Sequence, residues 1–267
     1  MIVNKPVIGI AAAVIVAAAG TWYYLHSRHA APPATPSAAQ LPAAAEPPAE
    51  SSVQHPLFAV QGETASREPL PALADSDAAL LDALGTAAGA AEMKDHLLPG
   101  NIIRHVVVTL DNLPRQKVAV DKRPVPPAEG SFAAEGDEVH ATLDPKNFAR
   151  YQPLVRAVSK IDMHALAAVY VRFYPLFQQA YLDLGYPNGY FNDRVVQVID
   201  TLLATPEPKG PIELVRPNVM YLYADPQLES RPAGQKLLLR MGPDNAAAIK
   251  LKLKELRTAV TVAPPQR

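Results

Sequence analysis

The 267-residue chain contains no cysteine, which excludes disulfide bonds, thiolate metal sites, iron–sulfur clusters and a cysteine nucleophile. It also has no excess of charge of either sign, since 25 basic residues stand against 26 acidic ones. A protein that binds nucleic acid through phosphate contacts needs a basic surface. The composition therefore argues against a DNA-binding or RNA-binding protein.

The familiar catalytic motifs are missing as well. The chain contains no GxSxG, HExxH, GxGxxG, GxxxxGK[ST] or EF-hand sequence. His96, His105, His140 and His164 each lack a second histidine at the spacing that helical or strand metal sites use. We therefore assign no catalytic residue, no metal site and no cofactor from the sequence.

One long hydrophobic run lies near the amino terminus. Residues 7–25, VIGIAAAVIVAAAGTWYYL, carry no charge. As a helix they would span about 28 Å, which matches the hydrocarbon thickness of a bilayer. Lys5 precedes the run, and Trp22, Tyr23 and Tyr24 stand near its end, where aromatic residues favour the membrane interface. We predict a transmembrane helix over residues 7–25 that contacts the lipid bilayer.

A cleaved signal peptide is the alternative interpretation of this run. A basic start, an apolar stretch and the alanines at residues 17–19 resemble the three regions of such a peptide. The apolar run continues past these alanines, which favours the membrane anchor. Lys5 lies before the run and Arg28 after it, so the positive-inside rule weakly favours a cytoplasmic segment at residues 1–6. The rest of the chain would lie in the periplasm of a Gram-negative source.

Alanine and proline dominate the segment that follows. Prolines interrupt any helix over residues 26–70, and large apolar residues are too few to form a core. We predict a flexible linker there, which acts as a spacer with a reach on the order of 35 Å. A globular domain is expected over residues 71–261 and a disordered tail over residues 262–267.

Helical periodicity dominates the globular domain, so the predicted fold is mainly α with minor β (α+β). Gly85 is expected to end or interrupt the first helix, and Asp144 and Asp162 are typical of helix starts. The β-branched residues of 102–113 would also suit a buried strand. Helices are expected over residues 78–84, 90–98, 102–113, 145–158, 163–184, 192–204 and 244–260, and short strands within residues 117–144 and 212–224, with residues 236–240 as a strand or a helical turn.

Three segments of the domain resemble a known family. They are DNLPR at residues 111–115, FYPLFQQAYLDLGYPNGYFNDRVVQVIDTLLATP at residues 173–206 and AGQKLLLRMGPDNAAAIKLKL at residues 233–253. In this order they resemble the bacterial family called domain of unknown function 3014, over residues 70–260. The resemblance implies a membrane-anchored protein without an assigned activity, and it supplies no catalytic residues.

The candidate binding residues lie mainly in the segment GYPNGYFNDR, at residues 185–194. Aromatic surface beside oriented polar groups is typical of sugar or peptide binding. Helix capping, ion pairing and packing against the core would account for the same residues. The candidate contacts are Tyr186, Tyr190, Phe191, Asn192, Asp193 and Arg194, with Asp111 and Arg115 as a charged pair that could join them.

Arg172 stands within the most apolar helix of the domain. A buried charge needs a partner, so we expect a structural ion pair with Asp193 or Asp111.

These features favour a single-pass inner-membrane protein with a periplasmic domain for binding or scaffolding. Its partner would be an envelope protein or the cell wall, in envelope assembly or maintenance. One alternative is a cell-wall hydrolase that uses paired carboxylates such as Asp111 and Asp193, which would have to face each other across a cleft. The other is an assembly factor that binds extended segments of envelope proteins.

Overall fold

The computed structural model describes residues 53–57, 69–87, 96–137 and 140–261. The predicted transmembrane helix at residues 7–25 and the predicted tail at residues 262–267 lie outside them, as do most of the linker and most of the expected helix at residues 90–98. Within the described ranges, no helix has the length and apolar character needed to cross a membrane. The described part covers the predicted globular domain apart from residues 88–95 and 138–139, and a short piece of the predicted linker.

Helices make up most of the described chain, which confirms the predicted α+β class. They are α2 (Asp77–Ala87), α4 (Ile102–Asn112), α5 (Lys146–Lys160), α6 (Met163–Asp183), α7 (Phe191–Leu203), α8 (Pro226–Glu229), α9 (Ala233–Met241) and α10 (Pro243–Thr261), with 3-10 turns η1 (Leu73–Asp75) and η2 (Val120–Lys122). The expectation that Gly85 ends the first helix is wrong, because α2 continues to Ala87. Glycine weakens a helix by only about 1 kcal/mol, and Leu80 and Ala83 bury this helix in the core.

Two aspartates set the starts of helices. Asp162 accepts hydrogen bonds from the backbone N–H groups of His164 and Ala165 at the start of α6, as predicted. The backbone N–H groups of Ala165 and His164 also hold the pKa of the Asp162 carboxyl below its ordinary value. Asp77 accepts from the N–H of Gly100 at 2.9 Å and from the N–H of Ile102 at 2.8 Å, and it thereby joins the starts of α2 and α4.

A small antiparallel sheet completes the fold. Its strands are β1 (Ala134–Gly136), β2 (Ala141–Leu143), β3 (Glu213–Val215) and β4 (Leu222–Tyr223), paired in the order β1-β2-β3-β4. These strands fall within the two predicted regions. The sequence KVAV at residues 117–120 forms no strand, because it leads into η2, and residues 236–240 belong to α9.

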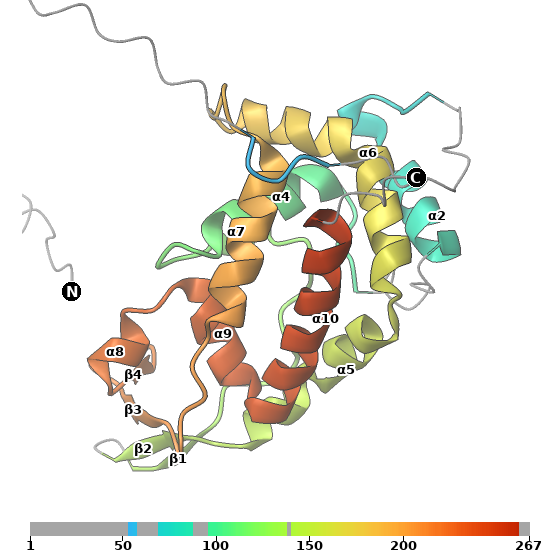
Figure 1. Ribbon diagram of the computed structural model, residues 1–267. Helices are drawn as coiled ribbons and strands as arrows, with labels where there is room; N and C mark the ends of the chain where they lie inside the picture. Colours follow the sequence, from blue (N-terminus) through green and yellow to red (C-terminus); the bar gives the residue numbers. More distant parts are fainter. Residues whose placement is uncertain (1–52, 58–68, 88–95, 138–139, 262–267) are drawn as a thin grey trace, which may run out of the picture. The chain divides into compact units, whose positions relative to one another are not determined.

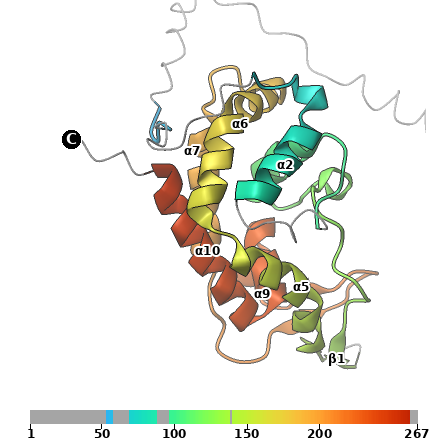
Figure 2. The same ribbon diagram turned by 90° about the vertical axis from the view of Figure 1, so that its right-hand side faces the viewer.

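Helix α6 lies at the centre of the helical part. In both views α2 and α10 lie on opposite sides of α6, and the sheet lies at one end of the helices (Figures 1 and 2). Helix α10 also packs against α5 and α7. Val107, Phe173 and Phe191 are completely buried where α4, α6 and α7 meet. The buried face of α4 rules out the strand alternative for residues 102–113.

Candidate functional site

One glutamine joins the connection between α6 and α7 to α6. The side chain of Gln178 on α6 donates to the carbonyl of Gly189 at 2.7 Å and accepts from the N–H of Phe191 at 2.8 Å. Tyr174 donates its hydroxyl to the same Gln178 oxygen at 2.8 Å. Gly189 is needed here, because a Cβ at this position would stand 2.7 Å from the Tyr181 ring. The loop therefore presents its tyrosines in a fixed arrangement.

The aromatic residues of this region form one cluster. Tyr181 and Tyr186 stack with ring centroids 4.7 Å apart, and the centroids of Tyr174 and Tyr190 lie 5.5 Å apart. Burial raises the pKa of Tyr174, so its hydroxyl stays protonated and serves as a donor. Phe191, which we predicted as a contact residue, is fully buried and belongs to the core.

A charged cluster lies beside these tyrosines. Asp111, with only 5% of its surface exposed, pairs with Arg115 at 2.6 Å and with Arg194 at 3.0 Å. The hydroxyl of Tyr186 donates to both Asp111 carboxylate oxygens at 3.2 Å. Arg194 also donates to the main-chain carbonyl of Asp111 at 2.7 Å. Candidate residues from two distant segments of the sequence therefore meet at one place.

Residues of these two clusters line an open polar pocket of about 400 Å³. This volume lies within the range of small-molecule and peptide side-chain sites. Its lining residues come from α4, α6, the loop before α7, α7 itself and the linker: Gln54, Asp111, Tyr181, Tyr186, Tyr190, Asp193, Arg194 and Gln197.

Residues 53–57, with the sequence VQHPL, lie against this site, and we call them the docked segment (Figure 1, blue). The N–H groups of Gln54 and His55 donate to the two carboxylate oxygens of Asp193, at 3.0 and 2.6 Å. The N–H of Leu57 donates to the hydroxyl of Tyr190 at 3.0 Å. The side-chain amide of Asn192 donates to the carbonyl of His55 at 2.8 Å. Four hydrogen bonds thus hold the main chain of this segment.

Residues of the domain hold the side chain of Asn192 independently of the docked segment. Its side chain is completely buried, and its amide also donates to the carbonyl of Val260 at 3.1 Å. Its carbonyl oxygen accepts from the hydroxyl of Tyr170 at 3.3 Å. Since both donors and the acceptor have partners, the amide is oriented by α6 and α10 rather than by the segment alone.

The side chains of the docked segment contribute unequally. Leu57 packs against a small apolar cluster of Ala167, Val196 and Val260. Val53 remains 47% exposed, and Gln54 and Pro56 are also exposed. The segment is therefore held by its main chain and by one apolar anchor.

The sequence alone does not identify the docked segment, because it predicts a spacer over all of residues 26–70. The sequence nevertheless contains an indication that this segment packs against the domain. Val53, Leu57 and Phe58 are large apolar residues that follow a stretch, residues 30–52, in which Leu41 is the sole large apolar residue. The capping alternative for Asn192 and Asp193 is not observed, since the residue at the N-cap of α7 is Tyr190 and makes no side-chain capping bond.

Arg172 does not form the ion pair that we expected. Among the described residues, Asp111 pairs with Arg115 and Arg194, while Asp193 binds the docked segment. The Nε of Arg172 is buried and has no hydrogen-bond partner among the residues that the structure describes, and its guanidinium carbon lies 5.5 Å from the centroid of the Phe173 ring. The guanidinium group therefore lies within cation–π distance of Phe173 and does not pair with Asp111 or Asp193.

Both carboxylates of the pocket have partners in the structure. Asp111 neutralises two guanidinium groups and accepts from a tyrosine, and both oxygens of Asp193 accept main-chain N–H groups. In the described part of the chain, no group of three or more His, Asp or Glu residues is arranged to hold a metal ion.

The fold and the pocket define a mainly helical α+β domain with an aromatic and charged site that holds an extended segment of main chain. The family model described as protein of unknown function (DUF3014) matches residues 102–257, more than half of the chain, and the chain belongs to this family. Neither a curated protein nor a solved structure was found to match it.

Proposed function

We propose that this protein is a scaffold whose helical domain binds extended peptide segments at the pocket between α4, α7 and the loop before α7. The observation that carries the proposal is the docked segment, whose main chain makes four hydrogen bonds to Tyr190, Asn192 and Asp193. Such contacts do not depend on the side chains of the ligand. An extended peptide with one apolar anchor at the position of Leu57 would therefore fit the site.

The docked segment would then be an internal occupant that competes with other peptides. A covalently attached ligand acts at an effective concentration in the millimolar range for a short flexible connection. An external peptide must overcome this advantage, either by higher affinity or by abundance. This arrangement suits a scaffold that exchanges its own segment for a partner.

We also propose that residues 7–25 anchor the protein in the bacterial inner membrane, with residues 1–6 in the cytoplasm and the domain in the periplasm. The support is the uncharged run and its flanking residues. The partner would be an envelope protein or a cell-wall component, and the role would be envelope assembly or maintenance. A reporter that is active only outside the cytoplasm, fused to the C-terminus, should be active; activity of a cytoplasm-only reporter would contradict this topology.

Cell-wall hydrolysis has less support. Asp111 and Asp193 line the same pocket, as that reading requires, but their oxygens are committed to arginine, tyrosine and main-chain partners. A binding site uses such fixed groups directly, whereas hydrolysis would need one of them to be released.

The test is a titration in trans. The full chain with Gln54→Pro and His55→Pro lacks the two N–H groups that bind Asp193, so its own segment should leave the site. We expect a fluorescent peptide with the sequence of residues 51–59 to bind this variant saturably at one site. Adding Asp193→Asn should weaken that binding by about 10-fold or more, as expected for the loss of a charge-assisted hydrogen bond. Adding Asp183→Asn, an exposed carboxylate at the C-terminal end of α6 that does not line the pocket, should leave it unchanged.

Absence of saturable binding to the double variant would contradict the proposal. Equal binding with and without Asp193→Asn would also contradict it, because the peptide would then bind elsewhere.

A further inference from the structure

A second cavity, of about 420 Å³, lies between the sheet and the first half of α10. It shares no lining residue with the pocket described above. Its apolar wall comes from four parts of the chain: Leu143 on β2, Phe148 on α5, Ile212 before β3, and Leu238 and Leu239 on α9. Leu143, Leu238 and Leu239 are each buried to 95% or more of their surface.

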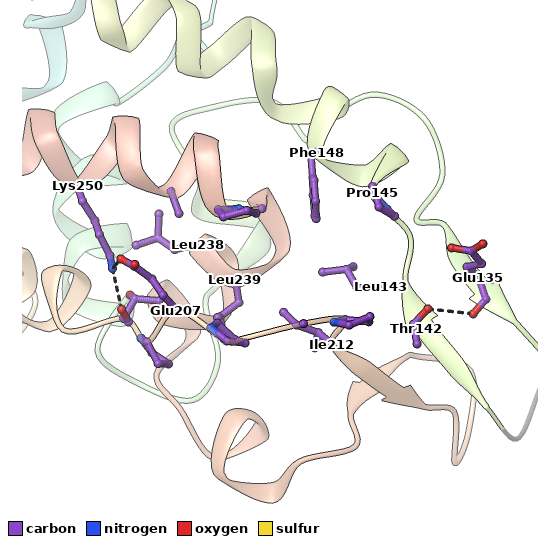
Figure 3. A pocket seen from close by; sticks show the side chains of 18 residues that line it. Glu135, Thr142, Leu143, Pro145, Phe148, Glu207, Ile212, Leu238, Leu239 and Lys250 are labelled. Atoms are coloured by element: carbon purple, nitrogen blue, oxygen red, sulfur yellow. Dashed lines mark hydrogen bonds and ion pairs between the residues drawn. The ribbon is translucent and has the colours of Figure 1, made fainter.

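Polar groups stand at the two ends of this cavity. Figure 3 shows Lys250 and Glu207 at one end, Thr142 and Glu135 at the other, and the apolar side chains between them. A cavity with an apolar middle and a cation at one end matches an elongated amphiphile with a negative head.

The partner of Lys250 is the exposed Glu207. The lysine side chain is only 13% exposed and donates to the carbonyl of Thr205 at 2.8 Å and to Glu207 at 2.9 Å. The Glu207 side chain is 75% exposed, on the loop that leads to β3. A largely buried ammonium group needs a negative partner, but an ion pair with so exposed a carboxylate adds little stability. Another carboxylate could therefore replace Glu207 while the charge of the site stays balanced.

Glu135 determines which end of the cavity the negative head of a ligand would occupy. It is exposed and lies at the end of the cavity remote from Lys250 (Figure 3). A negative head at that end would be repelled, whereas at the Lys250 end it would be paired.

We propose that this cavity binds a monomeric long-chain fatty acid, with its carboxylate on Lys250 in place of Glu207 and its hydrocarbon chain along Leu239, Leu143 and Phe148. Released from the lysine, Glu207 would turn to solvent. This site is independent of the peptide site, since the two share no residue.

The experiment uses the full chain and a photoactivatable fatty acid that carries a diazirine in its chain. After illumination, labelled residues are identified by mass spectrometry, and labelling is competed with hexadecanoic acid or with hexadecanol. We expect labels on the apolar wall, and hexadecanoic acid should compete at a concentration at least 10-fold lower than the alcohol of the same length.

Three variants identify the role of the charge. Lys250→Met removes the ammonium group and should abolish the preference for the acid over the alcohol. Glu207→Gln removes the competing carboxylate and should strengthen labelling by the acid several-fold. Lys254→Met, on the exposed side of the same helix, should change neither value.

Labels confined to residues outside the cavity would overturn the proposal. So would equal competition by acid and alcohol in the unaltered chain, or weaker labelling of the Glu207→Gln variant. Because Glu207 is exposed, this last variant should fold normally, and it keeps the test decisive even if Lys250→Met unfolds.

Discussion

Replacing Asp193 with asparagine should release the docked segment. In the native chain the two carboxylate oxygens accept the N–H groups of Gln54 and His55, at 3.0 and 2.6 Å. Asparagine keeps one acceptor oxygen, loses the charge and turns an NH₂ group toward a main-chain N–H. A hydrogen bond to a charged group contributes about 1.5–3 kcal/mol. Because the site is half-exposed, we expect a loss near the low end, about 2 kcal/mol.

A loss of about 2 kcal/mol corresponds to an approximately 30-fold change in the docking equilibrium. Hydrogen exchange measures this equilibrium at individual amides of the full chain. The amides of Gln54 and His55 should exchange about 30 times faster in Asp193→Asn than in the native chain.

Asp183→Asn is the matched control. Asp183 forms an exposed ion pair with Arg104 at 2.8 Å, and the hydrogen bonds that hold the docked segment come from other residues, Tyr190, Asn192 and Asp193. The same chemical change there should leave exchange at Gln54 and His55 as it is. Native protection of these two amides in Asp193→Asn would refute the role that we give to this carboxylate.

Three further predictions concern stability, each followed by urea unfolding. Burial raises the pKa of Tyr223 to about 12, so between about pH 10 and pH 12 the tyrosine keeps its proton in the folded chain and loses it in the unfolded chain. The free energy of unfolding should therefore fall by about 1 kcal/mol for each pH unit above pH 10. In Tyr223→Phe it should fall less steeply. Gly242→Ala should destabilise the domain by about 1–3 kcal/mol, since φ is +85° and the new Cβ would lie 2.5 Å from the Phe148 ring; a neutral result would contradict the packing. Asp111→Asn should lower the free energy of unfolding by about 2 kcal/mol, because it leaves Arg194 and Arg115 without their shared carboxylate. A change as small as that caused by Asp183→Asn would contradict the stabilising role of Asp111.

The helices were predictable because their signals are local. Asp162 marks the start of α6 by its short polar side chain, and the apolar spacing of 102–113 follows from the one face that α4 buries. The continuation of α2 past Gly85 was not predictable, since it depends on packing of Leu80 and Ala83 against residues far along the chain. Propensity alone does not report such contacts.

The candidate site was predictable in its residues but not in its partner. Tyr186 and Arg194 were identified from a short segment, and Asp111 was joined to them as a charged neighbour. The segment that Tyr190 and Asp193 bind lies 133 to 139 residues earlier in the chain, in a tract with the composition of a spacer. A few residues that dock against a distant part of the chain leave almost no periodic pattern in the sequence. The composition of the tract therefore predicts a spacer.

The most direct test of the central claim, that the site holds main chain, compares two synthetic peptides in the titration described above. Both have the sequence of residues 51–59, one with His55→Ala and the other with His55→Pro. Alanine keeps the N–H that donates to Asp193, and proline removes it. The account predicts that the alanine peptide binds about as well as the native sequence, while the proline peptide binds at least 10-fold more weakly. Equal binding of the two peptides would contradict it.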